Sequence, residues 1–195
     1  RTDYLSALFQ GDALPQEQQE AIAEKLEHFT GIEKAFWIRH HLRIDMQKEF
    51  AHLLLKDQGL FVGFYDGRYT WNDDPAIHDA NVIADDPAMG QYTPAFQTAF
   101  ALICKELNIT FNRSSKGLVF DVNETWQRKP KTSPAQALAG AMRRNRKLRV
   151  FFASGLYDLC TTAGNARYLA THSHLDPSRV LVGEYPSGHM AYLGE

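Results

Sequence analysis

Two residues near the C-terminal end of the sequence have side chains that could work together as an acid–base pair. Asp158 lies in the segment ASGLYDLCTT (153–162), and His189 lies in the segment YPSGHMAY (185–192). A serine and a glycine precede each of them and allow the chain to turn tightly. A carboxylate beside an imidazole fixes the tautomer of the ring and stabilises its protonated form. This combination is typical of enzymes that activate a nucleophile.

The elements around these residues predict that the two side chains meet. LRVFFAS (148–154) and VLVGEY (180–185) are apolar runs with the composition of strands buried on both faces, and TTAGNARYLATH (161–172) between them predicts a helix. Strand, helix and strand form a parallel crossover unit. In open α/β sheets the chemistry lies at the carboxyl ends of the strands, where Asp158 and His189 both follow.

The nucleophile of such a site is missing from the sequence. In α/β-hydrolases the catalytic residues follow the chain order serine, aspartate, histidine, and the serine stands in a G-x-S-x-G turn. No serine here has glycine two positions before and two positions after it. Ser154 precedes Asp158, but both belong to the same strand end, whereas the nucleophile needs a separate strand with its own oxyanion donors. We therefore expect the serine in a segment that precedes residue 1.

Several segments together resemble one enzyme family. ASGLYDLCTT, a helix, and then EYPSGHMAYL resemble the end of the serine carboxypeptidases, especially their bacterial branch. The resemblance extends more weakly upstream through TGIEKAFWIRHHLRI, LLLKDQGLFVGFYDGRYT and FDVNETW. It implies that Asp158 and His189 are members of a catalytic triad and that Met190 forms a wall of the leaving-group pocket. It also implies that the nucleophile, the oxyanion glycines and the groups that bind the terminal carboxylate of the substrate lie in an N-terminal half.

The predicted fold class is α/β, and the resemblance implies the C-terminal part of an α/β-hydrolase sheet with a mostly helical cap insertion. It implies that residues 1–131 form the helical cap region and that residues 132–195 form the hydrolase segment. Predicted helices cover 15–31, 31–41, 45–59, 93–108 and 133–147. A capping box of Thr30 and Glu33, and N-caps at Asp45 and Thr93, are expected to begin three of them. Residues 60–71 predict a hairpin or a sharp turn around Asp66-Gly67, and the acidic stretch 72–91 predicts a solvated loop.

Composition argues against several other classes of protein. The 195 residues carry a formal net charge of −2 and contain no long uncharged apolar run, so neither a nucleic acid nor a membrane is an expected partner. RRNRK (143–147) fits the last turn of a helix, where cations suit the dipole. HSHLD (172–176) has metal-ligand residue types but ends a helix before a turn, so a metal site is not expected there. The triad chemistry itself requires no metal or organic cofactor. Cys104 and Cys160 could pair or remain free thiols, and the three tryptophans fit core packing or a substrate pocket under the cap.

The expected function is that of a serine carboxypeptidase-like hydrolase acting on peptides, in which this chain supplies Asp158 and His189. A serine esterase or acyltransferase uses the same groups, and a non-catalytic binding domain with a relic triad is a further alternative. Since a two-stranded parallel sheet leaves edges open, we expect its own N-terminal half to complete it, or a second copy to dimerise through that edge. The resemblance suggests export from the cytoplasm.

Overall fold

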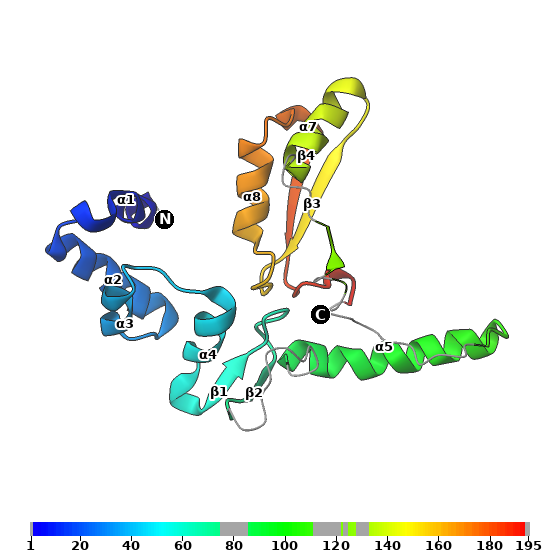
Figure 1. The fold of residues 1–195 in the computed structure, drawn as a ribbon, viewed down its shortest axis with the longest axis horizontal. Coiled ribbons are helices and arrows are strands. Elements are labelled where there is room, and N and C mark those ends of the chain that lie inside the picture. Colours follow the sequence, from blue (N-terminus) through cyan, green and yellow to red (C-terminus); the bar gives the residue numbers. More distant parts are fainter. Residues whose placement is uncertain (1, 75–85, 111–121, 123–124, 128–132, 194–195) are drawn as a thin grey trace. The chain divides into compact units, whose positions relative to one another are not determined.

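The structure is a computed structural model that describes residues 2–74, 86–110, 122, 125–127 and 133–193. Its helices and two small sheets place the chain in the α/β class (Figure 1). The chain forms two compact units, of which the first is Arg1–Val62 with Thr70–Asp74 and the second is Gly63–Tyr69 with Pro75–Glu195. The predicted boundary between 1–131 and 132–195 falls on residues outside the described part and stays a prediction.

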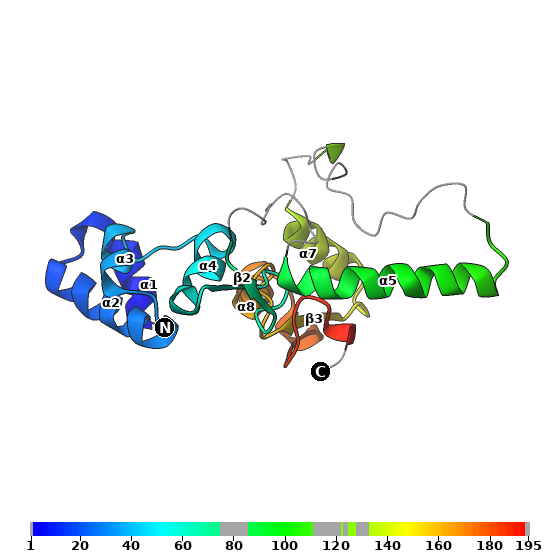
Figure 2. The ribbon, with the colours of Figure 1, turned by 90° about the horizontal axis from the view of Figure 1, so that it is seen from below.

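The first unit is a small helical body followed by a hairpin. Its elements are α1 (Thr2–Gln10), η1 (Gly11–Ala13), α2 (Gln16–Thr30), α3 (Lys34–Arg39), η2 (Met46–Phe50), α4 (Ala51–Leu53), η3 (Lys56–Gln58), β1 (Leu60–Val62) and β2 (Thr70–Asn72). Helices α1, α2 and α3 lie together (Figure 2). Their shared core consists of Ala7, Ile22, Ala23, Ile32, Trp37 and Leu42. Burial of these apolar side chains holds the helical body together.

The ends of the helices in this unit agree in part with the sequence. Helix α2 ends at Gly31, whose φ of 74° is the left-handed conformation that glycine adopts easily. The capping box predicted for Thr30 and Glu33 is wrong. The Thr30 hydroxyl donates to the Leu26 carbonyl and accepts from the Ile32 amide, so it completes α2 instead of beginning α3. Glu33 occupies the N-cap position of α3 without a side-chain bond.

Residues 45–59 do not form the single predicted helix. The Asp45 carboxylate accepts a hydrogen bond from the Lys48 amide at 2.7 Å, so the predicted cap is present. The Phe50 amide, however, donates to the Asp45 carbonyl five residues back, which is the spacing of a π turn. The segment consequently divides into η2, a short α4 and η3, and it ends at Gly59 with φ 67°.

The predicted hairpin over 60–71 is confirmed, because β1 and β2 pair antiparallel with Leu60 opposite Asn72. Residues 63–69 of its turn belong to the second unit. Trp37 is buried in the core of the first unit, whereas Trp71 and Trp126 are exposed. None of the helices in the described part of the chain is long and apolar enough to cross a membrane.

The second unit contains the elements that position the candidate site. They are α5 (Pro87–Glu106), α7 (Pro134–Arg144), β3 (Val150–Gly155), α8 (Ala163–His172), η5 (Pro177–Arg179), β4 (Val180–Tyr185) and η6 (Ala191–Leu193). Helix α5 begins earlier than Thr93, the predicted cap. Its N-cap is Asp86, whose carboxylate accepts from the Ala88 and Met89 amides, and Pro94 lies inside the helix. Helix α5 therefore includes the end of the stretch 72–91 that the sequence predicts to be a loop. Residues 75–85 of that stretch lie outside the described residues.

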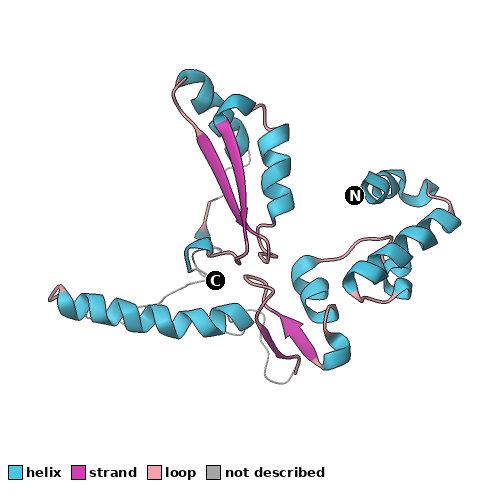
Figure 3. Ribbon diagram, turned by 180° about the vertical axis from the view of Figure 1, so that it is seen from behind, coloured by secondary structure: helices cyan, strands magenta, loops and turns pink. Residues whose placement is uncertain are grey.

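Strands β3 and β4 pair in parallel, from Val150 opposite Val180 to Gly155 opposite Tyr185, so the predicted strand–helix–strand unit is confirmed (Figure 3). One face of the pair packs on the helices through a small core, which comprises Leu138, Ala139, Met142, Leu148, Val150, Phe152, Leu175 and Val180. The expectation that both faces are buried is wrong within the described residues. Phe151 is 55% exposed and Leu181 is 67% exposed, because alternate residues of a strand point to opposite faces.

Candidate active site

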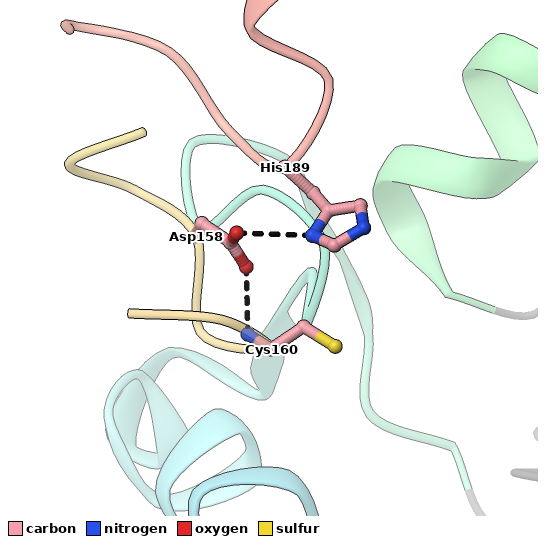
Figure 4. A group of neighbouring side chains, drawn as sticks. All are labelled: Asp158, Cys160 and His189. Atoms are coloured by element: carbon pink, nitrogen blue, oxygen red, sulfur yellow. Dashed lines mark hydrogen bonds and ion pairs between the residues drawn. The ribbon is translucent and has the colours of Figure 1, made fainter. Parts of the chain in front are cut away.

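The loops that follow β3 and β4 bring Asp158 and His189 together. The Nδ1 atom of His189 lies 3.0 Å from Oδ2 of Asp158 (Figure 4). The two residues are 31 positions apart in the sequence, and their proximity follows from the parallel pairing of the strands. The carboxylate and imidazole that the sequence singled out are therefore hydrogen-bonded partners at the carboxyl ends of the strands.

The Asp158 carboxylate is buried and fixed by its own loop. Its Oδ1 accepts hydrogen bonds from the Cys160 amide at 2.8 Å and the Thr161 amide at 2.9 Å. Its Oδ2 accepts from the Thr161 hydroxyl at 2.6 Å as well as lying beside the imidazole. Only 4% of Asp158 is exposed to solvent. Four donors thus surround the two oxygens, and the carboxylate cannot turn without losing some of them.

Asp158 does not act as the N-cap of the helix that follows it. Helix α8 begins at Ala163, and Thr162 occupies its N-cap without a side-chain bond. The aspartate instead closes a tight turn over Cys160 and Thr161, as aspartates do where a side chain replaces a backbone acceptor.

The hydrogen bonds assign the proton of the imidazole. An ionised carboxylate only accepts, so Nδ1 of His189 must donate to Oδ2 of Asp158. The Thr161 hydroxyl gives its own proton to the same Oδ2, and its oxygen lies 3.2 Å from Nδ1 as a second acceptor. In the neutral ring this leaves the lone pair on Nε2. Since the His189 side chain is 36% exposed, it is open to receive a proton from a reacting group.

The two loops are held against each other by backbone bonds and by glycines. The Leu156 amide donates to the Tyr185 carbonyl at 2.9 Å, and the Tyr157 amide donates to the Ser187 carbonyl at 3.1 Å. A Cβ on Gly155 would overlap the carbonyl oxygens of Ser187 and Gly188. The close approach of the backbones therefore requires glycine at the end of β3.

A third segment, residues 63–69, borders the Asp158–His189 pair, and the sequence did not predict this contact. The His189 amide donates to the Tyr65 carbonyl at 2.7 Å, and the Tyr65 ring meets the imidazole edge to face with centroids 5.3 Å apart. Burial raises the pKa of the Tyr65 phenol, and the nearby charges of Cys160, Asp86 and Asp158 raise it further. The tyrosine is therefore a neutral wall beside the imidazole. The only local signal was the Asp66-Gly67 pair, which indicated a turn but not its partner.

One group of side chains in the described residues could hold a metal ion. The ligand atoms of Asp158, Cys160 and His189 lie within 4.8 Å of one another, and thiolate, imidazole and carboxylate suit zinc. Both oxygens of Asp158 are, however, already occupied by four donors, so a cation would have to displace some of them. Burial, together with the charges of Asp158 and Asp86, raises the pKa of the Cys160 thiol, which disfavours the thiolate that binds metal.

Two residues of the HSHLD segment, His172 and Asp176, make contacts with neighbouring residues of the chain. The His172 ring stacks on Tyr168 at 4.0 Å between centroids, and Asp176 caps η5 through the Ser178 amide and pairs with Arg179. Met190 is half-buried next to His189, and its carbonyl accepts from the Leu193 amide at 3.0 Å. Its role as a wall of a leaving-group pocket stays a prediction.

Comparison with protein-family models, with curated proteins and with solved structures finds no match to this chain.

Proposed function

We propose that this chain is the Asp- and His-bearing part of a serine carboxypeptidase-like hydrolase. The observation that carries the proposal is the 3.0 Å hydrogen bond between Nδ1 of His189 and Oδ2 of Asp158, made by a carboxylate that is buried and fixed by three other donors. Its position at the carboxyl ends of two parallel strands is where α/β enzymes carry their chemistry.

In this proposal the residues have separate roles in the cleavage of the last peptide bond of a substrate. Nε2 of His189 takes the proton of an attacking serine hydroxyl and then gives it to the departing amino acid. Asp158 keeps the proton on Nδ1 and stabilises the imidazolium that forms. Water hydrolyses the acyl-enzyme by the same route in reverse. Met190 borders the leaving group. None of these steps needs a metal ion.

The serine in this scheme comes from the N-terminal half of the same protein, in a segment that precedes residue 1. The β3–β4 pair supports this because it leaves apolar side chains such as Phe151 and Leu181 uncovered in the described residues, and parallel sheets are normally covered on both faces. Further strands and helices of the full protein would cover this face and bring the nucleophile near Nε2.

The test uses the full-length protein, a fluorophosphonate probe and a peptide with a free C-terminus. We expect the probe to label a serine. His189→Ala should abolish labelling and hydrolysis, and Asp158→Asn should lower kcat by on the order of 10⁴-fold, as in other triads. The matched control is His172→Ala, which removes an exposed histidine at the end of α8 and should leave the rates unchanged.

Three outcomes would contradict the proposal in different ways. Near-wild-type hydrolysis by a folded His189→Ala protein would remove the histidine from the mechanism. Turnover of esters without any hydrolysis of peptides would favour the esterase or acyltransferase. Absence of labelling in the unmodified protein would favour a binding domain with a relic triad.

A further inference from the structure

The turn of residues 63–69 is bonded to both loops of the candidate site. The Leu159 amide donates to the Phe64 carbonyl at 3.1 Å, and the Gly67 amide donates to the Tyr157 carbonyl at 2.9 Å, so the turn is attached to the aspartate loop on both sides of Asp158. The 2.7 Å bond from the His189 amide to Tyr65 attaches it to the histidine loop. A segment some ninety positions upstream thus joins the two loops by main-chain bonds alone.

Within this turn, the buried Asp66 forms an ion pair with Arg68, whose side chain is 31% exposed, and the pair faces the histidine loop. Asp66 is 1% exposed, and its carboxylate accepts from the Arg68 amide at 3.1 Å, from Nε at 3.0 Å and from Nη2 at 2.9 Å. The Tyr92 hydroxyl of α5 adds a longer bond at 3.3 Å. This satisfies the buried carboxylate, because a charge that leaves water needs its partners inside the protein.

The free side of the guanidinium reaches the loops that carry the candidate site. Nη1 of Arg68 donates to the Pro186 carbonyl at 3.1 Å, three residues before His189. The same guanidinium lies 4.9 Å from the centre of the Tyr157 ring, the residue before Asp158. One side chain therefore contacts the turn, the histidine loop and the aspartate loop. Only a planar fork with several donors can make these contacts at once.

The Asp66 side chain also fills the space beside the histidine loop. A Cβ on Gly188 would come within 2.5 Å of the Cβ, Cγ and Oδ2 atoms of Asp66. The absence of a side chain at Gly188 lets the loop pack directly on the carboxylate. The position of His189, the next residue, is then set by contact with Asp66 as well as by its bond to Tyr65.

We infer that Arg68, held by Asp66, is a positioning residue for His189. It fixes the histidine loop at the separation from the aspartate loop that gives the Nδ1–Oδ2 bond. The geometric part of this inference concerns only the second unit, and its catalytic meaning rests on the proposed hydrolase function.

The experiment compares Arg68→Gln and Arg68→Lys in the full-length protein. Arg167→Gln is the matched control, because Arg167 is a half-exposed arginine paired with Glu184 and is not bonded to either loop of the site. The first readout is the NMR resonance of the Nδ1-bound proton of His189 and its exchange with water. Both Arg68 variants should speed this exchange at least tenfold, and the control should leave it unchanged. Lysine keeps the charge but not the fork, so it should not restore the signal.

The second readout separates this inference from the proposed function. If the unmodified protein hydrolyses peptides, the Arg68 variants should lower kcat by about tenfold to a hundredfold with little change in KM, which is the effect of a misplaced catalytic group. If it does not hydrolyse them, the function fails while the proton signal still tests the positioning. An unchanged proton signal in a folded Arg68→Gln protein would overturn the inference.

A measurement on the unmodified protein guards against variants that fail to fold. The backbone amides of Gly67, Leu159 and His189 all donate hydrogen bonds between the turn and the two loops, so they should exchange with solvent slowly and at similar rates. Rapid exchange of the His189 amide would show that the turn does not hold the loop, and the inference would be wrong.

Discussion

Replacing Gly155 by alanine is the most direct test of how the two loops are packed. Gly155 is the last residue of β3, and the space next to its Cα is occupied by the carbonyl oxygens of Ser187 and Gly188. These are main-chain atoms of the histidine loop, so no rotamer change can make room for a methyl group. The backbone itself has to move, and His189 follows directly after the displaced peptide.

The size of the effect can be worked from this geometry. Restoring an ordinary contact distance requires a displacement of about 1 Å between the loops, and a misplacement of that size costs about a hundredfold in rate when it separates catalytic groups. Overpacking of this kind also destabilises a protein by about 1–3 kcal/mol. We therefore expect Gly155→Ala both to lower the free energy of unfolding and to weaken the bond between Asp158 and His189.

The assay is urea unfolding of the full-length protein together with the NMR signal of the Nδ1-bound proton of His189. Gly164→Ala is the matched control. Gly164 is the second residue of α8, and a Cβ there would meet only the Thr162 hydroxyl at 3.9 Å, so the same change should not lower the free energy of unfolding. If Gly155→Ala were as stable as the unmodified protein and kept the proton signal, the close packing of the loops would be refuted.

Two further predictions concern neighbouring groups of the second unit. Asp86→Ala removes the acceptor of the Phe64 amide, bonded at 2.6 Å, and the acceptor of two amides in the first turn of α5. It should lower the free energy of unfolding by about 1–3 kcal/mol in urea titrations, and an unchanged free energy of unfolding would contradict this. Partial burial and the carboxylates of Asp158 and Asp86 raise the pKa of Cys160. A Cys104→Ser protein should therefore react with iodoacetamide more slowly at neutral pH when folded than in urea, and the folded rate should rise as the pH approaches the raised pKa. Equal rates in both states would be evidence against the partly buried position of the thiol.

The contact between Asp158 and His189 could be predicted from the sequence because it depends on local patterns. Two apolar runs and a helix between them predict a parallel unit, and parallel strands end at the same edge. The order of small residues before each side chain then places both on tight turns. The bond from the Cys160 amide to Asp158 could also have been predicted, since aspartate side chains in turns often accept from the backbone two residues on.

The role of Arg68 and Asp66 could not be predicted in the same way. Their partners Pro186 and Tyr157 lie far away in the sequence, and a charged pair beside a glycine is typical of any exposed turn. Burial of Asp66 is a consequence of the tertiary structure, which no periodicity in residues 63–69 reveals. The start of α5 was missed for a different reason. Thr93-Pro94 is itself a good start signal, but the Asp86-Pro87 pair seven residues earlier already supplies both the side-chain cap and the proline.

The hydrogen bonds also determine whether Asp158 or His189 can be replaced by alanine without leaving buried groups unpaired. When His189 is replaced by alanine, the Asp158 carboxylate still accepts from the Cys160 amide, the Thr161 amide and the Thr161 hydroxyl, so no buried charge loses all its partners. When Asp158 is replaced by alanine, those three donors lose their acceptor together, at a cost of about 1–3 kcal/mol for each one left buried. Substitution of His189 should therefore change the catalytic rate with little effect on stability, whereas truncation of Asp158 should also lower the free energy of unfolding. For the same reason asparagine, which keeps one acceptor oxygen for the two amides, is the substitution to use at Asp158.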